Sequence, residues 1–65
     1  MNTRVQTHKT SDTTSIITVN GHDVGMIKYK PDNDNLPYVA INPCGRVISL
    51  CHSYIEAMGA ILMHA

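Results

Sequence analysis

The chain has 65 residues, and its five Lys and Arg balance its five Asp and Glu, so the formal net charge at pH 7 is zero. A chain of this length forms one domain at most and buries only about 60% of its unfolded surface, so its stability is marginal unless metal, disulfides or self-association add to it. Balanced charge provides no long-range attraction for a phosphate backbone, which weighs against nucleic acid as a partner.

The polar beginning of the chain and its two cysteines indicate a cytoplasmic protein. Met1 is followed by the polar run 2–14 with no apolar signal segment, and Cys44 and Cys51 are too few for a disulfide framework. We expect Cys51 to be a small buried hydrophobic residue and Cys44 an exposed free thiol. No stretch approaches the roughly 20 apolar residues of a membrane span, because the C-terminal apolar run contains Glu56.

Residues 1–13 hold one large aliphatic side chain, Val5, among polar and charged residues. Such a segment buries too little apolar surface to offset the entropy lost on ordering. We therefore expect a flexible polar tail over 1–13 and a single domain over 14–65. The alternative is an edge strand around residues 4–8 that orders only against a partner.

A hairpin is the strongest local signal, because the β-branched run 16–19 is followed by Asn20-Gly21, and both of these residues tolerate positive φ. The hairpin loop could have two or four residues. The two resulting registers differ by two residues, so either choice puts the same side chains of the returning strand, 23–30, on the same face of the sheet. The two predicted faces are Ile17, Val19, Val24 and Met26 on one side, and Ile16, Thr18, Gly25, Ile27 and Tyr29 on the other. Both are partly apolar, whereas a sheet covered on one side is polar on the other, so we expect an additional contact.

Two further strands, 38–42 and 46–51, follow a loop rich in Pro, Asn and Asp. Ser53 then acts as an N-cap, and Glu56 three residues later completes a capping box that begins a helix over 53–65. The predicted fold class is α+β: a three- or four-stranded antiparallel β-meander with one C-terminal helix packed on one face.

The C-terminal helix has almost no polar side, which predicts a second partner for it. At 100° per residue, one stripe is assigned to the sheet, namely Tyr54, Ile55, Met58, Ile61, Leu62 and Ala65. The remaining face is the candidate interface: Glu56, Gly59, Ala60, Met63 and His64. Gly59 costs about 1 kcal/mol relative to Ala in a helix, so either another backbone approaches it closely or it packs over a strand. We expect a homodimer through this face or through the second face of the sheet.

Residue types that carry chemistry do not form a recognisable site. The candidate ligands for a metal lack the short spacing of structural zinc sites; they are His8, His22, Cys44, Cys51, His52 and His64. Cys51 and His52 are neighbours on a strand, where successive side chains diverge, so they do not form a nucleophile and base. We expect no enzyme activity, no cofactor and no bound metal.

One resemblance points to DNA. The segments Tyr38-Val39-Ala40, Gly45-Arg46 and Ser53 with Glu56-Ala57 resemble the small sheet-plus-helix DNA-binding modules of plant AP2 factors and integrase arm-binding domains. The resemblance implies DNA contacts from the basic and aromatic residues of the sheet, which are Lys28, Lys30, Arg46, Tyr29 and Tyr38.

Two functional hypotheses follow. The first is a non-catalytic binding module that acts by stoichiometric contact with another protein, as small regulators, adaptors and inhibitors from phages and mobile elements do. Its expected partners are a second copy of the chain and an unidentified protein. The second hypothesis is a sheet-plus-helix DNA-binding protein.

Overall fold

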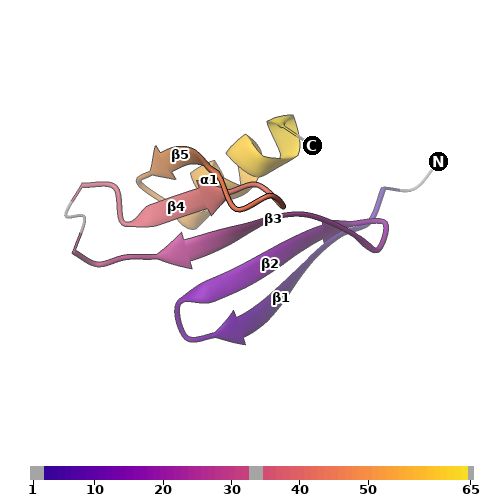
Figure 1. The fold of residues 1–65 in the computed structure, drawn as a ribbon, viewed down its shortest axis with the longest axis horizontal. Helices are drawn as coiled ribbons and strands as arrows, with labels where there is room; N and C mark the ends of the chain where they lie inside the picture. Colours follow the sequence, from indigo (N-terminus) through magenta and orange to yellow (C-terminus); the bar gives the residue numbers. More distant parts are fainter. Residues whose placement is uncertain (1–2, 33–34, 65) are drawn as a thin grey trace.

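A computed structural model describes residues 3–32 and 35–64. The described chain forms one antiparallel sheet whose five strands lie side by side in chain order, followed by a helix (Figure 1). The elements are β1 (Val5–Ser11), β2 (Thr14–Val19), β3 (His22–Tyr29), β4 (Tyr38–Ile41), β5 (Val47–Cys51) and α1 (Tyr54–Met63). The predicted α+β meander with a C-terminal helix is confirmed, but the sheet has five strands rather than three or four.

The additional strand is β1, which lies within the segment that the sequence assigned to a polar tail. It pairs with β2 from Val5 opposite Val19 to Ser11 opposite Thr14, and every side chain of β1 is exposed. Backbone hydrogen bonds to the edge of β2 stabilise β1. Because these bonds do not involve side chains, the hydrophobic pattern of the sequence does not reveal the strand. Residues 1 and 2 of the predicted tail lie outside the described residues.

The predicted β2–β3 hairpin is confirmed, and of the two loop lengths that the sequence left open it has the two-residue turn: Asn20 and Gly21 both have positive φ, and Val19 lies opposite His22. The pairing then shifts by one residue, so that Ile17 lies opposite Gly25. Val24 is the extra residue of this β-bulge. The predicted assignment of faces was therefore wrong, since a one-residue shift moves every later side chain of the strand to the other face.

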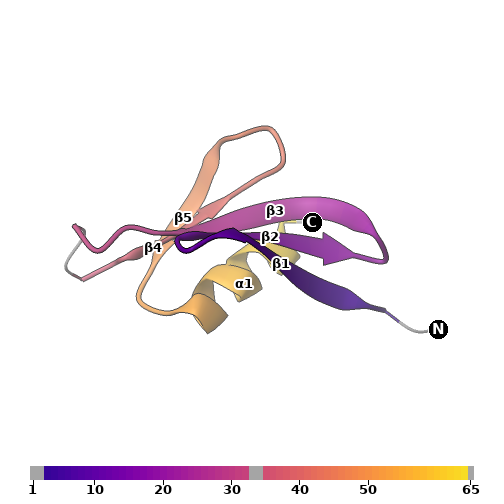
Figure 2. The same ribbon diagram turned by 90° about the horizontal axis from the view of Figure 1, so that it is seen from below.

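The helix covers one face of the sheet, across β3, β4 and β5. Figure 2 shows α1 on one side of the sheet and the β4–β5 hairpin bending away on the other. The core lies between α1 and the sheet, and it consists of Ile17, Ile27, Ala40, Cys51, Ala57 and Ile61. Cys51 is buried and Cys44 is exposed, both as free thiols, as predicted.

Gly25 allows α1 to lie close to the sheet. A Cβ atom at this position would lie 2.7 Å from the carbonyl oxygen of Ile41 and 3.0 Å from Cγ2 of Ile61. Its φ of +156° is also one that side-chain-bearing residues rarely adopt. The carboxylate of Asp23 accepts a hydrogen bond from the Gly25 N–H at 3.1 Å, which holds the bulge. The Ile61 side chain therefore occupies space that any other residue at position 25 would fill.

The start of the helix is capped as predicted. The Ser53 hydroxyl accepts a hydrogen bond from the backbone N–H of Glu56 at 3.2 Å. In return, the Glu56 carboxylate accepts from the backbone N–H of His52 at 3.0 Å, one residue before the usual partner in a capping box. These two bonds set the helix start, and with it the direction in which each helical side chain points.

Replacing Gly25 by Ala should lower the free energy of unfolding by about 2 kcal/mol or more, because the added methyl group overlaps backbone and core atoms. Gly45→Ala is a matched control: Gly45 also has positive φ, at +91°, but an added Cβ there meets nothing within 4 Å. That control should cost only about 1 kcal/mol, from backbone strain alone. Urea unfolding followed by circular dichroism measures both values. Equal losses would show that α1 does not approach β3 as described.

Candidate functional site

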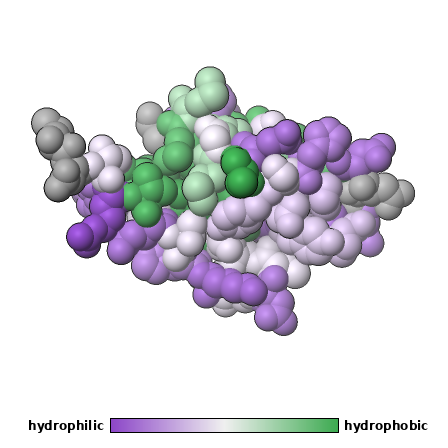
Figure 3. Space-filling model, turned by 180° about the vertical axis from the view of Figure 1, so that it is seen from behind, coloured by the Kyte–Doolittle hydropathy of each residue, from purple (hydrophilic) through white to green (hydrophobic). Residues whose placement is uncertain are grey.

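The face of α1 that points away from the sheet carries large apolar side chains. We define the outer helix face as Ile55, Glu56, Gly59, Leu62 and Met63. Ile55 is 81% exposed, Met63 is 88% exposed and Leu62 is 37% exposed. Figure 3, which views the molecule from the helix side, shows hydrophobic side chains gathered over α1 next to more polar surface. In a chain with so small a core, this is a large apolar surface to leave in contact with water.

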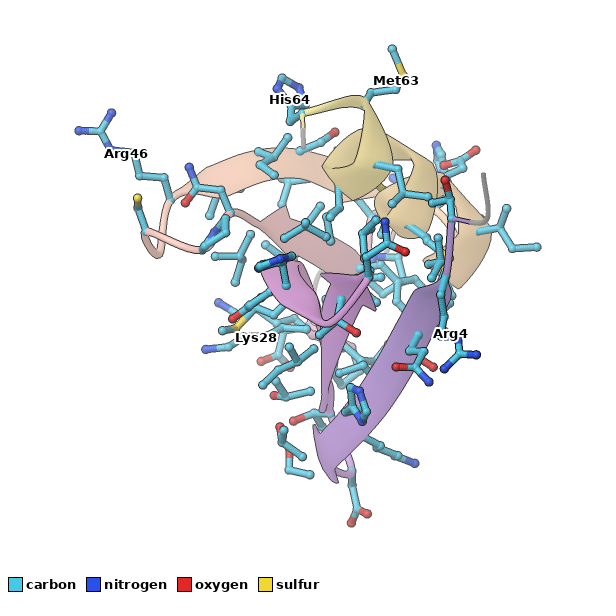
Figure 4. The ribbon with its side chains drawn as sticks, turned by 90° about the vertical axis from the view of Figure 1, so that its right-hand side faces the viewer. Arg4, Lys28, Arg46, Met63 and His64 are labelled. Atoms are coloured by element: carbon cyan, nitrogen blue, oxygen red, sulfur yellow. The ribbon has the colours of Figure 1, made fainter. Side chains whose placement is uncertain are left out.

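The structure leaves four of the five predicted interface residues exposed and half-buries the fifth. Glu56, Gly59, Met63 and His64 are exposed, whereas Ala60 is half-buried and packs against the core. His64 caps the C-terminal end of the helix, and Figure 4 shows it beside Met63 at the end of α1 distant from Lys28. Four of the five residues therefore lie where a partner could reach them, and Ala60 contributes only its exposed edge.

Assigning Ile55 and Leu62 to the core was wrong, because both are exposed. The side that faces the sheet is formed by Ala57 and Ile61, with Tyr54 and Met58 packed beside them. These four positions also repeat at helical spacing, but Ala57 is small, so a wheel that ranks residues by hydrophobicity gives it little weight. One signal in the sequence could have indicated the inner side of the helix. Gly25 lies in the middle of a strand, and a glycine there marks a place where another part of the chain approaches closely, which suits a small helical residue such as Ala57. Ala65 lies outside the described residues.

Gly59 lies in the middle of the outer helix face. An ideal Cβ at this position meets nothing within 4 Å, and no positive φ requires glycine there. Of the two explanations that the sequence left open, packing over a strand is therefore excluded. Close approach of a second backbone stays a prediction, and the open space at Gly59 leaves room for it.

The sheet face opposite α1 is a second apolar surface. Strand pairing places Met26, Ile41 and Val47 in one row across it, and Val39 and Leu50 in the next. Val39 and Ile41 are buried by their neighbours, whereas Val47 and Leu50 are 59% and 47% exposed. We call these five residues the second sheet face. The additional contact that the sequence led us to expect on the sheet stays a prediction.

The residues implied by the DNA-binding resemblance are not brought together. Lys28 pairs with Val39 and shares the second sheet face, on the side of the sheet away from α1 in Figure 4. Arg46 lies in the turn that leads into β5, and Lys30 follows the end of β3. Tyr29 and Tyr38 are on the helix side, where their ring centroids lie 5.2 Å apart. No common face therefore presents these cations together with the aromatic rings.

A hollow of about 560 Å³ lies beside the tyrosines. Tyr38 is in edge contact with Tyr54 as well, with ring centroids 6.2 Å apart, so the three rings form one wall. The opposite side is polar, and it includes Thr7 and Lys9 of β1. Lys9 and Asp12 are the only charged residues of this lining, and the strand pairing places Ser15 opposite Lys9. The hollow therefore combines an aromatic wall with hydroxyl-bearing and charged side chains.

Residues 3–32 and 35–64 contain no group of three or more His, Cys, Asp or Glu side chains placed to hold a metal ion. Over the same residues, no helix is long and apolar enough to cross a bilayer. No protein-family model, no curated protein and no solved structure matches the chain. Functional conclusions therefore depend on the geometry of its surfaces.

The orientation of α1 can be tested by two isoleucine truncations. Ile61→Ala should lower the free energy of unfolding by about 2–4 kcal/mol, because Ile61 is fully buried against Gly25. Ile55→Ala should change it by no more than about 0.5 kcal/mol, since Ile55 is exposed. Urea unfolding at low protein concentration measures both. A loss at Ile55 as large as that at Ile61 would mean that the helix is rotated.

Proposed function

We propose that this protein is a small non-catalytic binding module that acts by stoichiometric contact with another protein, through the outer helix face. Regulators, adaptors and inhibitors of the kind encoded by phages and mobile elements are its expected class. The observation that carries the proposal is the exposure of Ile55 and Met63, at 81% and 88%, on a helix that is otherwise packed on its sheet. Large exposed apolar patches on a small domain mark interaction surfaces.

The energy available at this surface is appropriate for a specific contact. Fully burying an Ile or Met side chain contributes about 1.5–3 kcal/mol, so Ile55 and Met63 together contribute about 3–6 kcal/mol. A micromolar complex requires about 8 kcal/mol. Leu62, which is 37% exposed, and polar contacts at the rim of the face add to this gain, which must also offset the entropy lost on association.

The second sheet face gives the module another apolar surface, on the side of the sheet opposite α1. Val47 and Leu50 are its exposed residues, and Lys28 adds a positive charge to it. A small domain with apolar surfaces on two opposite sides can contact two proteins at once, which is what an adaptor or a dimeric regulator requires.

DNA binding has less support. The modules that the chain resembles hold Arg and aromatic residues on the exposed face of the sheet. Here that face is formed largely by Met26, Val39, Ile41, Val47 and Leu50, with the tyrosines on the helix side. Apolar side chains at these positions offer nothing to phosphate oxygens or base edges.

The proposal predicts that a partner protein is captured through the outer helix face. The tagged chain should recover one protein from a lysate of the source cells, and the purified pair should sediment at a fixed stoichiometry. The double variant Ile55→Glu with Met63→Glu should lose at least ten-fold in affinity, because two charges would have to be buried. Val5→Glu on β1 is the control, since Val5 is also apolar and exposed but lies on another element.

Two results would contradict the proposal. One is capture that the double variant and the control retain equally. The other is retention on duplex DNA that falls with salt and is abolished by Lys28→Glu with Arg46→Glu, since that pattern identifies phosphate contacts.

A further inference from the structure

We propose that one occupant of the outer helix face is a second copy of this chain, with the two α1 helices crossing antiparallel at Gly59 about a two-fold axis. This inference rests on the proposed function, because it names a partner for the same surface. It specifies the contacts: Gly59 against Gly59 of the partner, and Ile55 against the partner's Met63.

The spacing of the exposed residues is symmetric about Gly59. Ile55 precedes Gly59 by four residues and Met63 follows it by four, and both side chains are almost fully exposed. In a two-fold contact the same patch meets itself, so each residue before the axis meets one equally far after it. An antiparallel crossing at Gly59 therefore pairs Ile55 of each copy with Met63 of the other. One symmetry operation therefore buries the two most exposed apolar side chains of the face.

Gly59 makes this crossing possible at short range. Residues 55, 59 and 63 form one i±4 row on the helix, and such rows on two helices run side by side when the axes cross at about 50°. A glycine in the middle of both rows leaves no side chain at the point of contact, so the two backbones can approach closely. The absence of any atom within 4 Å of an ideal Gly59 Cβ shows that this space is free in the monomer.

The charges of the helix also suit a copy of itself. Glu56 is the only Asp, Glu, Lys or Arg in residues 51–65, and it lies in the first turn, while His64 is at the opposite end. In an antiparallel crossing at Gly59, Glu56 lies three residues from the axis and therefore opposite the uncharged Leu62 of the partner, at the rim of the contact. The antiparallel crossing also sets the two helix dipoles in opposite directions, with unlike ends adjacent. No like charges are brought together on this face.

The size of the contact sets its strength. A helix of ten residues is roughly 15 Å long, so a helix pair alone buries less than the roughly 1,200 Å² of a standard stable interface. The dimer should therefore form at micromolar rather than nanomolar concentration. Sedimentation velocity should show a concentration-dependent shift from monomer to dimer across this range.

Cysteine cross-linking tests the symmetry directly. In a Cys44→Ser background, which removes the exposed thiol and leaves the buried Cys51, Gly59→Cys should form an intermolecular disulfide under mild oxidation. A residue on the axis meets its own copy, and a disulfide requires Cα atoms within about 4.4–6.8 Å. Ile55→Cys alone should cross-link at least ten-fold more slowly, while Ile55→Cys with Met63→Cys should cross-link readily. The double variant keeps Gly59, so it tests the arrangement even if a side chain at 59 disturbs it.

The possible outcomes separate this inference from the proposed function. Faster cross-linking of Ile55→Cys than of the other variants indicates a parallel or different contact and overturns the inference. A monomer at all concentrations, with a partner protein still lost by Ile55→Glu with Met63→Glu, also overturns it and leaves the proposed function in place. A dimer that cross-links as expected without any captured partner supports the inference and contradicts the proposed function.

Discussion

The close approach of α1 to β3 at Gly25 is the constraint on which the rest of the structure depends. Ile61 occupies the space where a Cβ at position 25 would lie, and the carbonyl of Ile41 closes the other side. The fully buried positions of the helix are therefore the small Ala57 and the anchor Ile61, with Tyr54 and Met58 packed at their sides. Packing geometry thus takes precedence over hydrophobicity in choosing the inner side of the helix.

The larger aliphatic groups are displaced to the outside as a result. Ile55 and Met63 point away from the sheet because the inner side is already occupied, and nothing in residues 3–32 and 35–64 packs over the outer side of α1. The same holds for Val47 and Leu50 on the other side of the sheet. A small two-layer protein has a high ratio of surface to volume, and exposed apolar groups of this size are the basis of the proposed interaction surface.

The sequence-based predictions that depend only on neighbouring residues, the hairpin turn and the helix cap, were confirmed. Asn20-Gly21 requires only that two residues tolerate positive φ, and Ser53 with Glu56 requires only two hydrogen bonds within one turn. The errors arose where a distant segment decides. Val24 and Ile48 are each the extra residue of a bulge, and both pack against the core, so the bulges increase the apolar groups that the helix side receives. Alternation along a single strand cannot show this, because the shift is defined only by the partner strand.

The sequence by itself determined the fold class, the main hairpin, the start of the helix and the apolar excess of its last thirteen residues. Each of these depends on neighbouring residues or on composition. Only the tertiary structure decided that residues 5–11 form an edge strand, since backbone hydrogen bonds to β2 do not depend on side-chain type. Only the tertiary structure decided, too, which side of α1 is exposed. That choice follows from the steric fit of Ile61 over Gly25, a contact between residues 36 positions apart that no periodicity encodes.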